Sequence, residues 1–256
     1  MVMKADFGKA ALDYRQYRHG FPPEFFKRIN QKGFGIKGQK VLDIGTGTGT
    51  IARGLALLGC EVKAIDPSAQ MIEQAKSIDQ EAGVSIDYSI GTAEETKQPD
   101  HSFDLVTAGQ CWHWFDAEKA IIEIKRILKP NGKLLIAHYD WIPLKGNIAF
   151  LTEELILKYN PAWQFPNGNG FYPKWVTQLS QAKFKNIETF SFDVMAEYSH
   201  EAWRGRMRAS AGMSASHLDP KQVQQFDEEL AKKLEEHFSN EPLKILHRCF
   251  VIMAEM

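Results

Sequence analysis

The residues with the clearest chemical purpose lie between Val41 and Thr50, where an apolar run leads into glycines at alternate positions. Glycine lets the backbone turn tightly and approach a ligand that a Cβ atom would push away. The helix predicted to follow points backbone N–H groups at the same ligand. We therefore predict a nucleotide-cofactor loop. Its expected cofactor-binding residues are Asp43, Gly45, Thr46, Gly47 and Gly49.

The spacing of these glycines bears on the identity of the cofactor. A dinucleotide-binding loop has the pattern G-x-G-x-x-G, and Thr50 stands where its third glycine would be. The spacing therefore argues against an NAD-dependent dehydrogenase, which would share the fold. A strand-to-helix turn can also contain glycines for purely steric reasons. The residues that follow the glycines are therefore needed to distinguish a cofactor loop from a plain turn.

A second acid follows the glycines at the distance expected for a ribose contact, about 20 residues. A short predicted strand ends in Asp66, whose carboxylate can accept both ribose hydroxyls of a nucleoside. Pro67 and Ser68 then open a helix, with Ser68 as N-cap and Gly83 at its end. We expect Asp66, Pro67, Ser68 and Met71 at the cofactor. The alternative is that Asp66 only caps a turn and that Met71 belongs to the core.

The Asp-x-Gly-x-Gly-x-Gly pattern resembles motif I of the class I S-adenosylmethionine (SAM) methyltransferases. The segment Asp100 to Phe115, with His-Trp-Phe at its end, resembles the methyltransferase type 11 branch, including relatives of trans-aconitate methyltransferase. The turn from Leu128 to Leu134 is similar to the one that precedes the fifth strand in that family. This resemblance covers residues 5–140. It implies SAM as the cofactor and S-adenosylhomocysteine as its product.

The same resemblance implies where the methyl group is transferred. Gly109 and Gln110 would approach the methionine end of SAM, because the loop after the fourth strand lies at the carboxyl edge of the sheet. His113 would touch the acceptor or the reacting centre; the alternative is a packed, neutral histidine between two tryptophans. Trp114 is a further candidate for contact with the acceptor, although packing explains it equally well.

The adenine-binding segment departs from the family pattern. Many relatives have Asp-Ala-Glu where this chain has Thr92-Ala93-Glu94. A threonine hydroxyl only partly replaces a carboxylate as acceptor for the exocyclic amine of adenine. The adenine contact is therefore left among Thr92, the Ala93 backbone N–H and Glu94.

Two other segments carry candidate binding residues. The segment Phe7 to Arg18 resembles a lid that folds over bound SAM through Tyr14 and Arg18, whereas the alternative is an amphipathic helix that covers the sheet edge. Late in the chain, arginines recur at alternate positions and could clamp a carboxylate bidentately. Helical spacing turns Arg206 away from Arg204 and Arg208, so the latter two are the expected substrate-binding pair. A solvated basic face is the alternative.

Strands and helices alternate between residues 41 and 139, which predicts an α/β fold. The expected architecture is doubly wound and Rossmann-like, with a mostly parallel seven-stranded sheet. The predicted strands are Val41–Ile44, Glu61–Ile65, Ser85–Ile90, Phe103–Ala108, Lys133–Tyr139, Ile187–Phe192 and Ile245–Met253. A helix capped by Asp116 precedes the fifth strand, and helical patterns near 200–213 and 220–238 separate the last two, where this class usually has a short hairpin.

We expect one methyltransferase domain over residues 1–256. Its predicted parts are amino-terminal lid helices over 1–35, a SAM-binding core over 36–140, and a helical substrate cap formed by 141–180 and 199–240. The acceptor is expected between the loop 109–115 and this cap.

Composition limits the classes of partner. The 256 residues carry a formal net charge of −1, so no basic field favours a nucleic acid. Cys60, Cys111 and Cys249 are far apart in apolar surroundings, which suits reduced thiols and neither a disulfide framework nor a metal site. An apolar signal core and a membrane-spanning apolar run are both missing. We expect a cytoplasmic monomer or homodimer.

These inferences predict a methyltransferase that acts on a small molecule. A carboxylate acceptor is already ionised at pH 7 and needs only to be oriented. An amine or hydroxyl would need a base, for which His113 and Tyr14 are the candidates. A tRNA-modifying methyltransferase and a catalytically silent SAM-binding scaffold protein are the alternatives.

Overall fold

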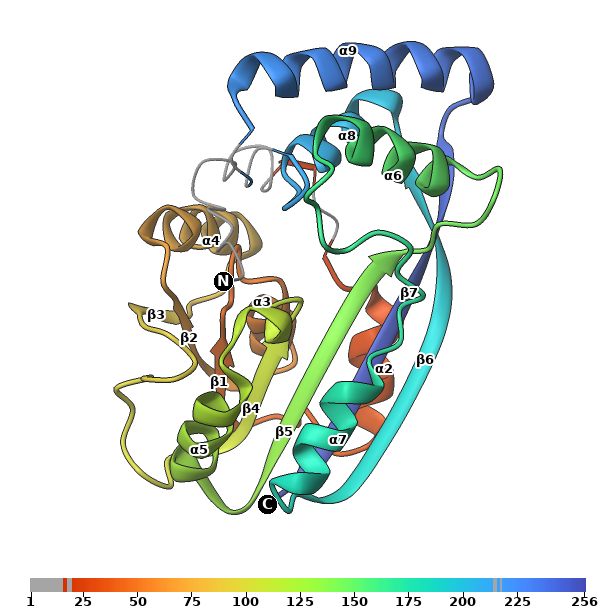
Figure 1. Cartoon of the computed structure of the whole chain (residues 1–256). Coiled ribbons are helices and arrows are strands. Elements are labelled where there is room, and N and C mark those ends of the chain that lie inside the picture. Colours follow the sequence, from red (N-terminus) through yellow and green to blue (C-terminus); the bar gives the residue numbers. More distant parts are fainter. Residues whose placement is uncertain (1–15, 18–19, 214–215, 217) are drawn as a thin grey trace. The chain divides into compact units, whose positions relative to one another are not determined.

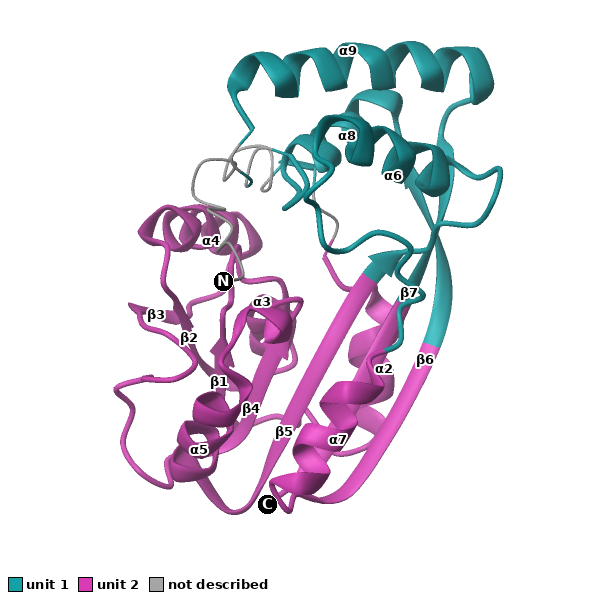
Figure 2. Cartoon of the chain, viewed as in Figure 1, with its two compact units in different colours: residues 1–19, 140–171, 192–248 teal, residues 20–139, 172–191, 249–256 magenta. Residues whose placement is uncertain are grey.

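The computed structural model describes residues 16–17, 20–213, 216 and 218–256 (Figure 1). The chain divides into two compact units (Figure 2). Unit 1 comprises residues 1–19, 140–171 and 192–248, and unit 2 comprises residues 20–139, 172–191 and 249–256. Residues 172–180, which were predicted to belong to the cap, group with unit 2.

Seven strands form a single sheet in the order β3-β2-β1-β4-β5-β7-β6. The pairings β1–β2, β2–β3, β1–β4 and β4–β5 are parallel. The strands are β1 (Lys40–Ile44), β2 (Glu61–Asp66), β3 (Asp87–Ile90), β4 (Phe103–Gly109), β5 (Leu128–Trp141), β6 (Lys185–Tyr198) and β7 (Leu243–Glu255). The predicted seven-stranded Rossmann-like fold is confirmed. Strands β5, β6 and β7 are longer than predicted, and β5 contains the predicted turn from Leu128 to Leu134. Strand β3 begins at Asp87 and not at Ser85.

The helices are divided between the two units. Unit 2 contains α2 (Pro23–Gln31), α3 (Thr50–Leu57), α4 (Ala69–Ala82), the 3₁₀ turn η2 (Trp112–Trp114), α5 (Ala117–Ile127) and α7 (Pro173–Gln181). Unit 1 contains α6 (Ile148–Tyr159), α8 (His200–Arg208) and α9 (Pro220–His237). Helices α8 and α9 thus occupy the segment between β6 and β7, as predicted. No helix in the described part of the chain is both long and apolar enough to span a membrane.

Local sequence sets the ends of the helices that border the expected site. The Ser68 hydroxyl accepts a hydrogen bond from the Met71 N–H at the start of α4, and Gly83 ends that helix at a φ of 68°. The Asp116 carboxylate accepts from the Lys119 N–H at the start of α5. Both predicted N-caps are confirmed. Each satisfies a backbone donor that the first turn of a helix leaves unpaired.

The central strands β1 and β4 are buried on both faces, as expected for a parallel sheet covered by helices. Leu42 and Ile44 of β1 belong to a buried cluster that includes Ile124 of α5 and Leu179 of α7. Side chains alternate along a strand, so Asp43 points toward the opposite face. The carboxyl ends of the parallel strands consequently present β1, β2 and β4 side chains at one edge of the sheet.

The core of unit 1 is formed by α6, α8 and α9, in which α9 contacts both other helices. Trp203 of α8 is fully buried and donates its indole N–H to the Thr152 hydroxyl of α6 at 3.0 Å. Phe226 and Leu230 of α9 are also fully buried. Helix α9 begins with a capping box in which Asp219 and the third helical residue exchange hydrogen bonds.

Candidate active site

The three predicted loop glycines all adopt left-handed backbone angles: φ is 63° at Gly45, 57° at Gly47 and 79° at Gly49. Residues other than glycine rarely adopt these left-handed backbone angles. Space is short as well. A Cβ on Gly45 would lie 2.9 Å from Cys111 Cβ, and one on Gly49 would lie 2.4 Å from the Tyr88 hydroxyl oxygen. The loop therefore requires glycine for both conformation and packing.

Asp43, directly before this loop, is almost fully buried, at 2% exposure. Its carboxylate accepts hydrogen bonds from the Thr46 and Thr107 hydroxyls, each at 2.6 Å. Burial, opposed by these hydrogen bonds, raises the pKa of Asp43 from its ordinary 3.8 to about 6. The carboxylate thus ties the glycine loop to β4.

Asp66 ends β2 beside the same loop. Its carboxylate accepts the Gly47 N–H at 2.8 Å and the Ser68 N–H at 2.9 Å. Burial raises the pKa of Asp66, while these two backbone hydrogen bonds oppose the shift. A carboxylate offers about four acceptor positions, so two such bonds leave capacity for the hydroxyls of a ribose. Met71, the fourth predicted contact here, is buried at 3% exposure.

A largely buried polar network joins the glycine loop to α3, α4 and β3. Arg53 of α3 donates to the Thr48 carbonyl oxygen at 2.8 Å and to the Asp79 carboxylate of α4 at 2.6 Å. The Tyr88 hydroxyl donates to the other oxygen of Asp79 at 2.8 Å. This network was not predicted from the sequence; the arginine inside an otherwise apolar helix is the one local signal of it.

The predicted adenine segment is held against α5. Thr92 pairs with Glu95 across a short turn, Ala93 is buried at 2% exposure, and Glu94 accepts the Asp116 N–H at 2.9 Å. One oxygen of the Glu94 carboxylate is thus bonded to the start of α5. Thr92, the Ala93 N–H and Glu94 all stay predictions for the adenine contact.

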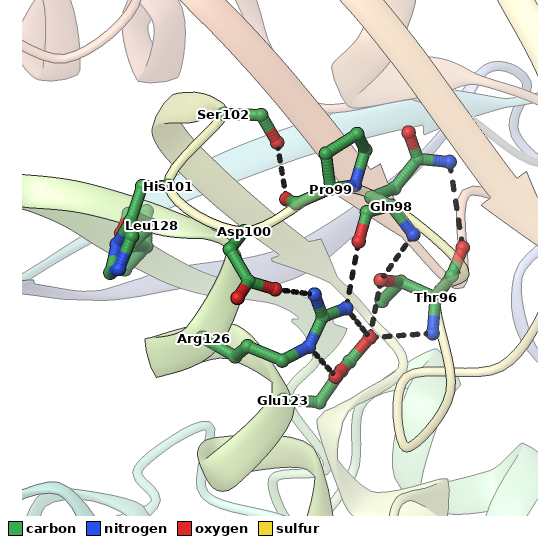
Figure 3. Close-up of polar contacts among 9 residues, drawn as sticks. All are labelled: Thr96, Gln98, Pro99, Asp100, His101, Ser102, Glu123, Arg126 and Leu128. Carbon is green, nitrogen blue, oxygen red and sulfur yellow. Dashed lines mark hydrogen bonds and ion pairs between the residues drawn. The ribbon is translucent and has the colours of Figure 1, made fainter.

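Figure 3 shows how the residues after this segment are anchored. Glu123 of α5 accepts hydrogen bonds from the Thr96 N–H and from Arg126. Arg126 also pairs with Asp100 and donates to the Gln98 carbonyl oxygen at 2.8 Å. The hydrogen bond from Arg126 is the largest influence that lowers the pKa of Glu123 to about 2.

The segment at the end of β4 packs closely against the glycine loop and α3. A Cβ on Gly109 would lie 2.4 Å from Ile51 Cδ1 of α3. Gln110 adopts a φ of 59° and donates its N–H to the Ala137 carbonyl oxygen at 2.9 Å. In η2, the buried Trp112 donates its indole N–H to the Gln178 side chain at 3.2 Å. Trp112 is therefore a packing residue.

A line of three polar side chains begins at His113. Its Nδ1 lies 3.3 Å from Nε2 of His138, which is near the carboxyl end of β5. His138 Nδ1 lies 3.1 Å from the Tyr172 hydroxyl, and the Tyr172 ring stacks on Trp175 with centroids 3.9 Å apart. The ring of Trp114 lies 4.6 Å from that of His113. His113 is thus a half-buried member of a hydrogen-bonded line.

Comparison with known proteins agrees with this geometry. Residues 42–136 match the family of methyltransferase domains. An uncharacterised methyltransferase of Mycobacterium tuberculosis is 35% identical over 133 residues, which cover 52% of this chain and 51% of that protein. A ubiquinone biosynthesis O-methyltransferase of Xanthomonas euvesicatoria is 28% identical over 186 residues, 72% of this chain and 75% of that protein. The chain spans about half the length of the mycobacterial relative.

A solved structure is similar over the whole chain. Phosphoethanolamine N-methyltransferase 2 of Haemonchus contortus, in complex with phosphomonomethylethanolamine and S-adenosylhomocysteine, has a TM-score of 0.59 at 20% identity. The similarity covers 100% of this chain and 60% of that one. This chain has the class I methyltransferase fold. The narrower resemblance to trans-aconitate methyltransferase relatives stays a prediction.

Within the methyltransferase fold, the predicted site residues fall into two groups. Unit 2 contains those of the glycine loop, Asp66 and its neighbours, the adenine segment and the loop from Gly109 to Trp114. The structure brings the glycine loop into contact with Asp66 and with the segment after β4. His138 and Tyr172 were not predicted as site residues, because they lie far from His113 in the sequence.

The predicted carboxylate clamp is occupied within unit 1. Arg204 and Arg208 of α8 both bind Asp227 of α9, and Arg208 also pairs with Glu201 at 2.9 Å. Arg206 is buried at 5% exposure, with its guanidinium 4.9 Å from the centre of the Trp141 ring. The prediction that Arg206 lies apart from the other two is confirmed. Arg204 and Arg208 thus link α8 to α9 through Asp227.

The predicted lid residues, Tyr14 and Arg18, lie outside the described residues. Tyr17 is described and belongs to unit 1. Its ring lies 5.7 Å from the Arg208 guanidinium, and a Cβ on Gly205 would come within 2.1 Å of that ring. Tyr17, which belongs to the predicted lid segment, therefore packs on α8.

Proposed function

We propose that this protein is a SAM-dependent methyltransferase that methylates a small molecule. The observation that carries the proposal is the loop of three left-handed glycines with the Asp66 carboxylate beside it. A loop without Cβ atoms lets a ligand approach its backbone closely, and Asp66 keeps acceptor positions for ribose hydroxyls. The proposed SAM-binding residues are Asp43, Gly45, Thr46, Gly47, Gly49, Asp66, Pro67, Ser68, Met71, Thr92, Ala93, Glu94, Gly109 and Gln110.

The cofactor supplies an intrinsically electrophilic methyl group, so the chain has mainly to bind, align and shield the reactants. Asp43 and the Arg53 network fix the shape of the loop. Gly109 and Gln110 approach the methionine end, as expected for the carboxyl edge of the sheet. His113 and Trp114 then border the acceptor.

The comparisons support this proposal at two levels. The match to methyltransferase domains covers the glycine loop, Asp66 and His113. The similar solved structure holds S-adenosylhomocysteine. That protein is named as an N-methyltransferase and another relative as an O-methyltransferase, so both nitrogen and oxygen acceptors have support. The carboxylate variant of the proposal has less support, because Arg204 and Arg208 already bind carboxylates.

The alternatives are a tRNA-modifying enzyme and a silent SAM-binding protein. A net charge of −1 gives little attraction to RNA, whose binding depends on phosphate contacts by Lys and Arg. A silent SAM-binding protein would have the same cofactor site but would transfer no methyl group.

Calorimetry with SAM, S-adenosylhomocysteine and NAD tests the cofactor. We expect binding of the first two and none of NAD; the opposite result would contradict the proposal. Incubation with methyl-labelled SAM and a panel of small acids, amines and phenols, beside tRNA, tests the acceptor. Label in tRNA alone would favour the RNA enzyme. Cofactor binding with no transfer to any component of a cell extract would favour the silent protein.

A further inference from the structure

We propose that His113, His138 and Tyr172 form a proton-transfer chain that deprotonates the methyl acceptor, so that the acceptor is a hydroxyl or an amine. This proposal rests on the proposed methyl transfer and specifies its substrate class. The three residues come from η2, from β5 and from the position before α7, and all belong to unit 2. Two contacts, of 3.3 Å and 3.1 Å, join their polar atoms into one line.

The chain begins beside the cofactor loop. A Cβ on Gly45 would lie 2.9 Å from Cys111 Cβ and 3.2 Å from Phe115 Cζ, so the segment that contains His113 packs on that loop. The hydrogen bond from the Gln110 N–H to the Ala137 carbonyl oxygen aligns the ends of β4 and β5. His113 is consequently held at the sheet edge where open α/β folds bind their ligands.

The two hydrogen bonds permit two neutral arrangements of protons. In the first, His113 Nδ1–H donates to His138 Nε2, and His138 Nδ1–H donates to the Tyr172 oxygen. His113 then has a lone pair on Nε2. In the second, the Tyr172 O–H donates to His138 Nδ1, His138 Nε2–H donates to His113 Nδ1, and His113 carries its proton on Nε2.

Conversion of the first arrangement into the second carries a net one proton from the acceptor to water, through a transfer at each residue of the chain. The acceptor proton goes to His113 Nε2, the Nδ1 proton of His113 goes to His138 Nε2, and the Nδ1 proton of His138 goes to the Tyr172 oxygen. The original hydroxyl proton of Tyr172 leaves to water, since that residue is half-buried. The overall reaction balances: the acceptor gains a methyl group and loses one proton.

The middle residue of the line is packed among aromatic rings. His138 is buried at 7% exposure, and its ring lies 4.7 Å from that of Tyr172 and 5.5 Å from that of Trp175. These rings fix the orientation of the imidazole between its two hydrogen-bond partners.

This chemistry distinguishes classes of acceptor. A carboxylate has a pKa near 4 and is ionised at pH 7, so it has no proton to give. A phenol has a pKa near 10 and is protonated at the same pH. A three-residue chain that accepts protons beside the cofactor loop therefore matches a phenolic, alcoholic or amino acceptor.

Nuclear magnetic resonance of protein labelled with ¹⁵N-histidine tests the chain without any acceptor. Correlation spectra report which ring nitrogen of each histidine carries the proton. Tyr172→Phe removes one hydroxyl and should shift the ring nitrogen signals of both His138 and His113. The control is His101→Asn, because His101 lies just before the start of β4, beside the first residue of β5, at a φ of 49° that asparagine tolerates. If Tyr172→Phe leaves the signals of His113 unchanged, the proposal is overturned.

Kinetics at fixed pH test the catalytic role, with catechol and the more acidic 4-nitrocatechol as probe acceptors. His113→Gln should lower kcat with catechol about 100-fold, the usual worth of a general base, and much less with 4-nitrocatechol. Tyr172→Phe should lower it about fivefold, the worth of one hydrogen bond. SAM affinity should not change in either variant.

The outcomes separate this proposal from the proposed function. If wild-type protein fails to bind SAM, the proposed function is wrong. If it binds SAM and methylates carboxylates alone, or if His113→Gln loses the same factor with both catechols, methyl transfer stands and the proton chain is wrong. If neither catechol is a substrate, the nuclear magnetic resonance result decides.

Discussion

In unit 2, the carboxylates at the carboxyl ends of the parallel strands and those at the amino ends have opposite surroundings. At the carboxyl edge, Asp43 and Asp66 accept hydrogen bonds from neutral hydroxyls and backbone N–H groups, and burial raises the pKa of each. Toward the amino edge, Glu123 pairs with Arg126, and Asp104 lies 2.7 Å from the Lys129 ammonium. The pKa values of Glu123 and Asp104 are lowered, although partial burial opposes the shift at Asp104.

We interpret this difference as a division of roles, in which the ion-paired carboxylates hold the fold and Asp66, beside the glycine loop, is the proposed ligand contact. An ion-paired carboxylate has its charge neutralised within the protein and contributes to stability. A buried carboxylate with neutral donors keeps a charge to offer to a polar or cationic ligand. Perturbation of this second kind gathers at functional sites. The following predictions test the comparison, from the largest expected effect to the smallest.

Gly49→Ala should destabilise the protein by roughly 2–5 kcal/mol, the sum of a left-handed alanine and an overpacked methyl group. The clash is with the Tyr88 hydroxyl oxygen, 2.4 Å from the added Cβ. Gly83→Ala is a matched control, because Gly83 has a φ of 68° and no atom within 4 Å of an added Cβ. Urea unfolding measures both. Equal losses would show that packing behind the cofactor loop is unimportant.

Asp43 should make the protein less stable as the pH rises. Its pKa is raised in the folded state from 3.8 to about 6, so its contribution is complete below pH 3.8 and is lost as the pH rises through about 6. The loss is up to about 3 kcal/mol, from 1.36 kcal/mol per pKa unit. Unfolding of wild type and Asp43→Asn between pH 4 and 7 measures it. Parallel curves for the two proteins would contradict the prediction.

Asp66→Ala should weaken SAM binding by about 2 kcal/mol at pH 7, the cost of removing a charged hydrogen-bond acceptor. Asp87→Ala is the control, because Asp87 is an exposed carboxylate at the start of β3, paired with Lys63 at 3.1 Å. Calorimetry compares the two variants. Unchanged affinity in Asp66→Ala would place the ribose elsewhere.

Glu123→Gln should lower the free energy of unfolding by about 1.5 kcal/mol at pH 7, because it removes a charged partner of Arg126. The folded-state pKa is lowered from 4.5 to about 2, so this contribution is present above pH 4.5 and is lost as the pH falls toward 2. Glu118→Gln, at an exposed position of the same helix, is the control. The pH trend is opposite to that of Asp43. A difference between wild type and Glu123→Gln that does not shrink on acidification would count against the ion pair.

The features predicted from sequence are those that a few neighbouring residues determine. The glycine loop, the N-caps Ser68 and Asp116 and the strand positions each follow from a short pattern, and the structure confirms the caps and the strands. The extra length of β5, β6 and β7 was missed. Pro130, Asn131 and Gly132 indicated a turn and hid the start of β5. The outer residues of β6 do alternate in burial, so that extension could have been predicted.

The features that could not be predicted depend on residues that only the fold brings together. His113 meets His138 because β4 and β5 are neighbours, and Tyr172 joins them from a segment that looked like part of the cap. Arg204 and Arg208 bind Asp227 because α8 packs on α9. A helical pattern shows which face an arginine occupies and not which carboxylate will face it.

The buried Cys111 offers a chemical measure of how firmly the glycine loop is held. Its thiol donates to the Ile44 carbonyl oxygen at 3.2 Å, and burial raises its pKa well above 9.0, so the thiol is unreactive in this structure. A thiol reagent can reach the sulfur only when the residues around it move apart. We therefore expect Cys111 to be labelled slowly, and more slowly still when a ligand is bound at the glycine loop.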